Sequence, residues 1–298
     1  MHFIDVVLIT VIGIIEGITE WLPVSSTGHM MIFEHFFTGV FSEGFFTKDF
    51  KDMFDYLIQL GAIIAVIVMF WKRIFPFGTE KREETMADGS TVLKSKVVSK
   101  PSIWKMWLKV VVACVPAVVA LFVDKLFDNI GNTAQIVTVG SMLILYGAAF
   151  IVIERLHKNK QPKIETVDGM SYLTAFFIGC FQVLAAVPGT SRSGVTIIGA
   201  LILGLSRTAA AEFTFFLAIP TMVGASGYKI LKFVKNGGVI TTPQISALIL
   251  GMVVAFVVSL FVIRFLMDFV KKHDFESFGW YRIALGALVI VLCLCIPV

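Results

Sequence analysis

The chain has 298 residues, of which 57% are hydrophobic and 15% are charged, and its mean hydropathy is +0.88. Soluble domains carry about 25% charged residues, so this composition excludes a disordered chain and argues against a soluble globule. The net charge of +4 does not indicate nucleic-acid binding, because the basic residues lie in short loops between apolar stretches. We predict an all-α polytopic membrane protein.

Six apolar stretches are long enough to cross the ~30 Å hydrocarbon layer of a bilayer as helices. In chain order they are Phe54–Trp71, Trp104–Val123, Thr133–Ile153, Ala209–Tyr228, Gln244–Arg264 and Phe278–Val298.

Two further apolar regions, Val7–Leu22 and Tyr172–Val187, each run into a break that contains Pro and Ser before the apolar pattern resumes. The arms before the breaks span about 24 Å as helix, whereas the return arms span only about 15 Å and are too short to cross. Irregular backbone at membrane depth is tolerated only inside protein or beside a cavity. We therefore predict two re-entrant helical hairpins, over residues 7–37 and 172–205.

The two halves, residues 1–153 and 171–298, each consist of a hairpin followed by three spans. A hairpin returns to its starting side and three spans do not, so the halves are predicted to form an inverted-topology repeat within one membrane domain, residues 1–298. This layout brings broken helices together near the midplane. The loops predicted inside, including the polar loop 72–103, hold 15 Lys and Arg against 6 outside, which places both termini outside.

The first break follows two carboxylates. Glu16 and Glu20 lie four residues apart and so share one helix face. Buried neighbouring anions favour a shared proton or a bound cation, and hard oxygen ligands suit Mg²⁺ or Ca²⁺. The alternative is that they cap a helix or pair with a basic residue.

The break itself offers Ser25, Ser26, Thr27 and His29. The hydroxyls would cap the following helix, or His29 would deprotonate Ser26 or a water, or protonate a leaving group.

The second break places Arg192 between Ser191 and Ser193, flanked by Gly189 and Gly194. Glycines permit close backbone approach, N–H groups at a helix start bind anions, and Arg adds a fork matched to phosphate oxygens. Alternatively, the guanidinium only neutralises the carboxylates. Together, the two breaks contain the groups needed for metal-assisted phosphoryl transfer, and their depth favours a lipid-borne phosphate.

Residues 16–29, EGITEWLPVSSTGH, and residues 188–196, PGTSRSGVT, closely resemble the two signature motifs of the undecaprenyl-diphosphate phosphatase family, also called bacitracin-resistance proteins. Residues 54–61 and 213–220 resemble the family too, with Thr214 where Ser is expected, and the resemblance covers essentially the whole chain.

The resemblance implies a bacterial membrane hydrolase that converts undecaprenyl diphosphate to the monophosphate, depends on a divalent cation, and opens its site to the outer face. It implies Glu16 and Glu20 as cation ligands or base, with Ser26 and His29 as nucleophile and partner. The diphosphate would be held by Arg192 with Ser191, Ser193, Thr196, Gly189, Gly194, Ser25 and Thr27. The oligomeric state is left open, with a homodimer as one alternative.

The competing function is a transporter or flippase for a phosphate-bearing lipid or anion, because inverted repeats with broken helices are transporter architecture. The type-2 phosphatidic-acid phosphatases are set aside, because they need a His six residues after the motif Arg and position 198 is Ile198. Gln182 takes the place of Glu16 in the second half, either as a polar cavity contact or as a packing amide.

Overall fold

The structure, a computed structural model, describes residues 2–41, 45–85, 91–127, 130–158 and 160–296. Six of its helical segments are long and apolar enough to cross a membrane, which confirms the predicted all-α polytopic class. The end of the predicted last span, at Val298, lies outside the described residues. The spanning segments are α3 (Lys48–Met69), α5 (Pro101–Cys114) with the start of α6 (Ala117–Phe127), α7 (Asn132–His157), α10 (Arg207–Lys235), α11 (Thr242–Phe269) and α12 (Glu276–Cys295).

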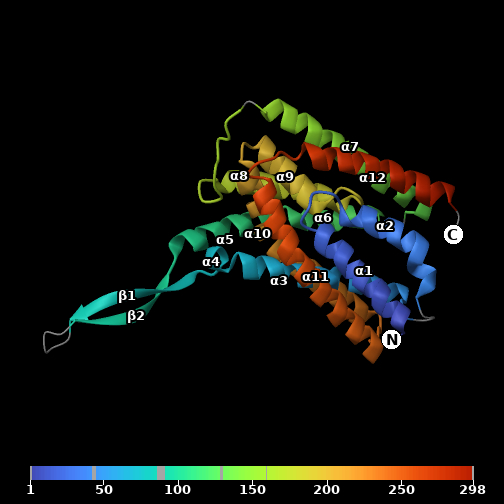
Figure 1. Cartoon of the computed structure of the whole chain (residues 1–298), viewed down its shortest axis with the longest axis horizontal. Helices are drawn as coiled ribbons and strands as arrows, with labels where there is room; N and C mark the ends of the chain where they lie inside the picture. Colours follow the sequence, from blue (N-terminus) through green and yellow to red (C-terminus); the bar gives the residue numbers. More distant parts are fainter. Residues whose placement is uncertain (1, 42–44, 86–90, 128–129, 159, 297–298) are drawn as a thin grey trace.

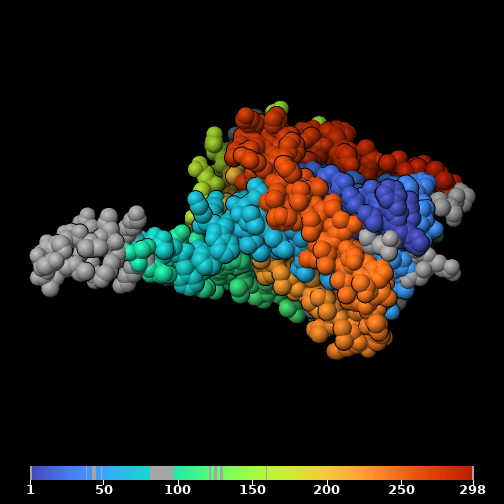
Figure 2. Space-filling model, turned by 60° about the horizontal axis from the view of Figure 1, so that its bottom comes forward, coloured from blue at the N-terminus to red at the C-terminus, as the bar shows by residue number. Residues whose placement is uncertain are grey.

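The spans expose apolar side chains, as contact with lipid tails requires. The clearest case is α11, whose fourth-residue spacing places one exposed stripe along the helix. Figure 2 shows α11 (orange) at the surface beside α1 (Phe3–Thr19, dark blue). The stripe consists of Ile249, Val253, Val257, Phe261 and Phe265, each more than 40% exposed.

Both predicted breaks separate two short helices. In the first half α1 is followed by α2 (Ser26–Phe37) and a short 3-10 turn, η1 (Thr38–Val40). In the second half α8 (Tyr172–Val183) and the turn η2 (Leu184–Ala186) precede α9 (Arg192–Ile202). With 12 and 11 residues, α2 and α9 extend only about 17–18 Å. Their re-entrant path stays a prediction.

The two halves pack against each other reciprocally. The first arm α1 packs on α11 of the second half, and α8 packs on α5 of the first, while α3 faces α10 and α7 faces α12. A glycine permits each close approach, because a Cβ on Gly17 would lie 2.9 Å from the carbonyl oxygen of Ala255, and one on Gly179 would overlap the carbonyl of Ala113. This reciprocity is the packing expected of an inverted repeat. The division at residues 1–153 and 171–298 stays a prediction.

Two segments differ from the simplest expectation. The predicted span Trp104–Val123 is not one continuous helix but breaks between α5 and α6, because Pro116 has no N–H and its ring clashes with the preceding turn. The polar loop 72–103 is largely ordered: after α4 (Trp71–Ile74), β1 (Phe77–Thr85) pairs antiparallel with β2 (Thr91–Ser99), and this ribbon projects away from the helices (Figure 1).

The segments predicted to share one side of the membrane lie together in the structure. One cavity is lined by residues 153–154, 157–158 and 160–163 with Arg207 and Lys271, and another by Lys72, Lys100 and Asp168. At the opposite end Asp49 and Asp52 line a small cavity with Lys229 and Lys232. The relative arrangement of the loops therefore agrees with the topology map, and the assignment of the first end to the cytoplasm stays a prediction.

Candidate active site

The site forms where the tips of the two broken regions meet. Ser25, directly before α2, has a φ of 74°, and Ser191, directly before α9, has a φ of 70°; they are the only non-glycine residues with positive φ in the described part of the chain. Such backbone costs about 1–3 kcal/mol and persists where the surroundings enforce it. The two serines occupy matching places in the two halves, so both helices begin from the same strained turn.

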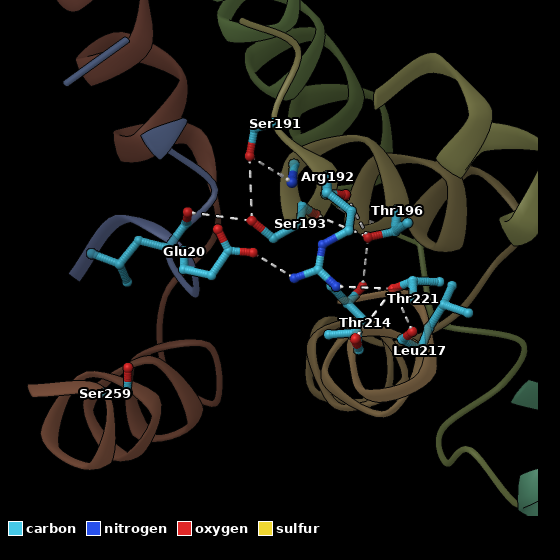
Figure 3. A network of polar contacts seen from close by, with 12 residues as sticks. Glu20, Ser191, Arg192, Ser193, Thr196, Thr214, Leu217, Thr221 and Ser259 are labelled. Carbon is cyan, nitrogen blue, oxygen red and sulfur yellow. Dashed lines mark hydrogen bonds and ion pairs between the residues drawn. The ribbon is translucent and has the colours of Figure 1, made fainter. Parts of the chain in front are cut away.

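Arg192 reaches across from the second tip to the first (Figure 3). Its Nη2 donates to Oε1 of Glu20 at 2.6 Å, and Nη1 donates to the hydroxyl of Thr221 on α10 at 3.4 Å. The two charged side chains are 16% and 8% exposed. The structure thus brings together the two charged residues that sequence analysis placed in separate breaks.

The hydroxyls beside Arg192 form a small network. The Oγ of Ser191 accepts from the N–H of Gly194 at 3.2 Å and lies 3.3 Å from Oγ of Ser193, which donates to the carbonyl of Leu22 in the first tip. The hydroxyl of Thr196 lies deeper: it donates to the carbonyl of Arg192 at 2.9 Å and accepts from Thr214. Ser191 therefore caps α9, and Ser193 joins the two tips.

Sequence analysis missed Arg282 of α12, which is fully buried beneath both tips. Its guanidinium donates to the carbonyl of Pro23 at 3.2 Å in the first tip, and to those of Gly189 and Thr190 at 3.1 and 2.9 Å in the second. The sequence contains one indication of its importance: Arg282 is the only charged residue of the predicted span Phe278–Val298. Arg282 holds the two breaks in register.

His29 lies in the first turns of α2, and both of its ring nitrogens have partners. Nδ1 is 2.8 Å from the carbonyl oxygen of Ser25, and Nε2 is 2.7 Å from the hydroxyl of Tyr281, whose ring stacks on the imidazole. No contact between His29 and Ser26 is found among the described residues, so their pairing stays a prediction. Ser26 is partly exposed and Thr27 is exposed.

Several buried oxygens at or near the tips find no hydrogen-bond partner among the described residues. They include Oε1 of Glu16, Oγ of Ser25 and Oε1 of Gln182. The charged side chains of Glu20, Asp55 and Arg192 interact electrostatically with Glu16. Buried polar atoms are normally paired, so these oxygens suit a ligand or ion. Within the described residues no group of three or more His, Cys, Asp or Glu is close enough to hold a metal.

An apolar cavity of about 370 Å³ begins at the first tip. Leu22, Val24 and His29, which lie in or next to the first tip, form part of its lining. Its remaining walls come from α1, α11 and α12 and consist of Ile18, Thr19, Phe265, Phe269, Ser277, Phe278 and Tyr281.

Comparison with known proteins identifies the family of this chain. The family model described as bacitracin resistance protein BacA matches residues 9–288. Curated proteins named undecaprenyl-diphosphatase are similar over nearly their full length: the Enterococcus faecalis protein is 50% identical, covering 98% of both chains. The Lachnoclostridium phytofermentans protein is 48% identical, covering 97% of both chains. The Streptococcus equi subsp. zooepidemicus protein is 47% identical, covering 98% of this chain and 97% of its own. This chain therefore belongs to the BacA bacitracin resistance family.

Proposed function

We propose that this chain hydrolyses undecaprenyl diphosphate to undecaprenyl phosphate and inorganic phosphate at the meeting point of its two tips. This reaction recycles the lipid carrier of cell-wall synthesis and underlies bacitracin resistance. The observation that carries the proposal is the contact of Arg192 with Glu20 at 2.6 Å, which joins two residues that lie 172 positions apart in the sequence. A cation and a carboxylate buried together at membrane depth mark a functional site.

The residues at the tips supply what attack on phosphorus needs. Arg192 presents a guanidinium fork to the phosphate oxygens, and the N–H groups that begin α2 and α9 add donors without charge. In the hydrolysis a water oxygen ends on the distal phosphorus, the anhydride P–O bond breaks, and the electron pair leaves with the lipid monophosphate. Glu20 or His29 takes the proton of the attacking O–H group, whether that group belongs to Ser26 or to water.

The carboxylates fit a divalent cation. In the part of the chain that the structure describes, Oε1 of Glu16 is buried without a hydrogen-bond partner, and so is Oδ1 of Asp55 on α3. Glu16 and Glu20 would hold Mg²⁺ or Ca²⁺, and the cation would neutralise charge on the diphosphate. A pair of carboxylates completed by substrate phosphates and water is the usual protein site for Mg²⁺, which favours Mg²⁺ over Ca²⁺ here.

The apolar cavity beside the tips accounts for a lipid substrate. Because Leu22 and Val24 flank Pro23 inside the first motif, a chain lying in this cavity would place its diphosphate at the tips. The positive-inside count places both termini on the outer side of the bacterial cell membrane, and the family resemblance implies that the site opens to the same side.

The decisive assay is phosphate release from undecaprenyl diphosphate by the pure protein in detergent, with and without chelator. We expect release that chelation abolishes and that excess Mg²⁺ restores. The competing transporter function predicts the reverse pattern, in which proteoliposomes take up a labelled anion or flip a lipid phosphate and release no phosphate.

The Ser26→Ala variant decides which oxygen attacks the phosphorus. Complete loss of phosphate release, with the fold retained, would support Ser26 as the nucleophile. Substantial residual activity would exclude an obligatory serine nucleophile and leave water as the attacking group.

A further inference from the structure

A second cavity, larger than the one beside the tips, plays no part in the proposed reaction. It measures about 600 Å³ and lies where the C-terminal ends of α7 and α11 meet the N-terminal end of α10. The connection from α7 to α8, yellow-green in Figure 1, runs along this end of the molecule. We refer to this cavity as the basic pocket, because its lining includes Lys158, Lys160, Lys163, Arg207 and Lys271.

The single carboxylate in the lining, that of Glu154, is already satisfied. It accepts three hydrogen bonds from Arg207, between 2.5 and 3.1 Å, and a fourth from the N–H of Phe275 at 3.0 Å. The two side-chain charges therefore cancel, and this pair builds the wall of the pocket. Lys271 is also paired, with Asp268 at 2.9 Å.

The other three lysines keep their charge. No ion pair is found for Lys158, Lys160 or Lys163 within the described residues, and all three are exposed. One acidic group near them is already engaged, because Glu276, close to Lys158, pairs with Arg155 at 2.6 Å. The lining therefore has an excess of positive charge, with five Lys and Arg residues against one carboxylate.

The backbone that carries these lysines is fixed in place. The N–H groups of Lys163 and Ile164 donate to the carbonyl of Gly204 at 2.9 and 3.0 Å, and the N–H of Ser206 donates back to Ile164 at 2.8 Å. Gly204 has a φ of 90°, and a Cβ there would lie 3.3–3.4 Å from the stem of Lys163. The lysine stem therefore packs over the glycine, and its ammonium group is presented from an ordered loop.

The remaining lining is apolar, with Ile153, Leu201, Leu203, Leu205 and Val270 forming part of the wall. Ile202 in the same lining is 48% exposed, and Leu156 on the adjacent turn of α7 is 62% exposed, so the pocket adjoins the lipid-facing surface. An inorganic anion needs no apolar wall, whereas a phospholipid brings acyl chains beside its phosphate. Basic pockets between membrane helices on the cytoplasmic side bind anionic headgroups, and the positive-inside count assigns this end to the cytoplasm.

We propose that the basic pocket binds the phosphate headgroup of an anionic membrane phospholipid, with Lys158, Lys160 and Lys163 as its cationic contacts and the apolar wall against the acyl chains. This site is separate from the tips that carry Glu20 and Arg192, and its occupancy does not depend on the hydrolytic reaction.

The test measures lipid binding by the full chain in zwitterionic micelles, with phosphatidylglycerol as the probe and phosphatidylcholine as the neutral comparison. We expect phosphatidylglycerol to bind preferentially, and the double variant Lys160→Gln, Lys163→Gln to weaken its binding at least about tenfold, since each basic residue near a membrane surface contributes about 1 kcal/mol. The matched control, Lys232→Gln with Lys235→Gln, removes the same charge from the far end of α10 and should bind as the wild type does.

Three results would overturn the proposal: wild-type affinity in the pocket variant, an equal loss in the control, or displacement of phosphatidylglycerol by an equal concentration of inorganic phosphate, which would indicate a plain anion site. The pocket variant should keep its thermal unfolding midpoint and its phosphate release in zwitterionic detergent, because neither lysine contacts the tips. This readout separates loss of the lipid site from loss of the fold or of the proposed reaction.

Discussion

At the scale of single residues, the site depends on Arg192, whose partners Glu20 and Thr221 come from two different helical elements. Replacing Arg192 with Ala removes the phosphate fork and leaves a buried carboxylate without its partner. We expect phosphate release to fall at least about a hundredfold, the usual cost of losing a preorganised donor to a developing charge, while the protein elutes as a folded species.

The conservative variant Arg192→Lys separates charge from geometry. Lysine keeps the positive charge but has no planar fork, so its activity should lie between that of the wild type and that of the Ala variant. Wild-type turnover by Arg192→Ala in the phosphate-release assay would eliminate the proposed anion site.

Arg282 is a positioning residue, because its three carbonyl acceptors belong to the backbone of the two tips. In Arg282→Met these acceptors lose charge-assisted hydrogen bonds of about 1.5–3 kcal/mol each. We expect a lower thermal unfolding midpoint and a reduced kcat, both partly restored in Arg282→Lys, whose single ammonium reaches fewer carbonyls. The exposed Arg264 on α11 provides the control, since Arg264→Met should change neither quantity; equal effects of the two Met variants would contradict a positioning role for Arg282.

At the scale of helices and strands, the lengths of the apolar stretches and the positions of helix-breaking residues predicted much of the architecture. The membrane spans follow from the lengths of the apolar stretches, and both breaks follow from the positions of Pro and Ser, which affect the backbone locally. The β1–β2 ribbon was not predicted, because its sequence is polar and charged and lacks the alternation of apolar and polar residues that marks a half-buried strand. Arg282 lacked a motif: its role comes from tertiary contacts with Pro23 and Gly189, which lie 259 and 93 residues away.

The reciprocal packing of the first arms makes a prediction about glycine. In Gly179→Ala the new methyl group would overlap the backbone of Ala113, and overpacking of this kind costs about 1–3 kcal/mol. We expect a lower unfolding midpoint. In Gly224→Ala nothing lies within 4 Å of the new methyl group, and the gain in helix propensity of up to about 1 kcal/mol should leave the midpoint unchanged or raise it. A Gly179→Ala protein as stable as the Gly224 variant would contradict the close α8–α5 contact.

The apolar cavity predicts selectivity for lipid length. Ile18 lines this cavity and is 37% exposed, so in Ile18→Trp the larger side chain fills the cavity and leaves the core intact. We expect the KM for undecaprenyl diphosphate to rise about five- to thirtyfold, the equivalent of about 1–2 kcal/mol of apolar burial, with little change for a short-chain polyprenyl diphosphate. Ile14 is 39% exposed one turn earlier and does not line the cavity, so Ile14→Trp is the matched control; equal effects on both substrates, or in both variants, would remove the lipid from this cavity.

At the scale of the whole molecule, the loops sort into two ends, and the count of basic residues assigns each end to a side of the membrane. One group of basic residues, Lys229, Lys232 and Lys235, lies on the predicted outer side. Lys229 and Lys232 share their cavity with Asp49 and Asp52, and Lys229 lies 4.6 Å from the ring centre of Tyr56, so two of these three lysines lie beside acidic or aromatic side chains.

The assignment can be tested with single cysteines placed at the two ends. In a background whose four native cysteines are replaced by alanine, Ser95→Cys labels the ribbon and Val239→Cys labels the loop between α10 and α11; both positions are exposed. Because a charged maleimide does not cross the membrane, intact cells should show labelling at position 239 alone, and lysed cells at both positions. The reverse pattern would place the basic pocket on the outer surface and the termini inside, so that the charge bias had failed to set the orientation of this chain.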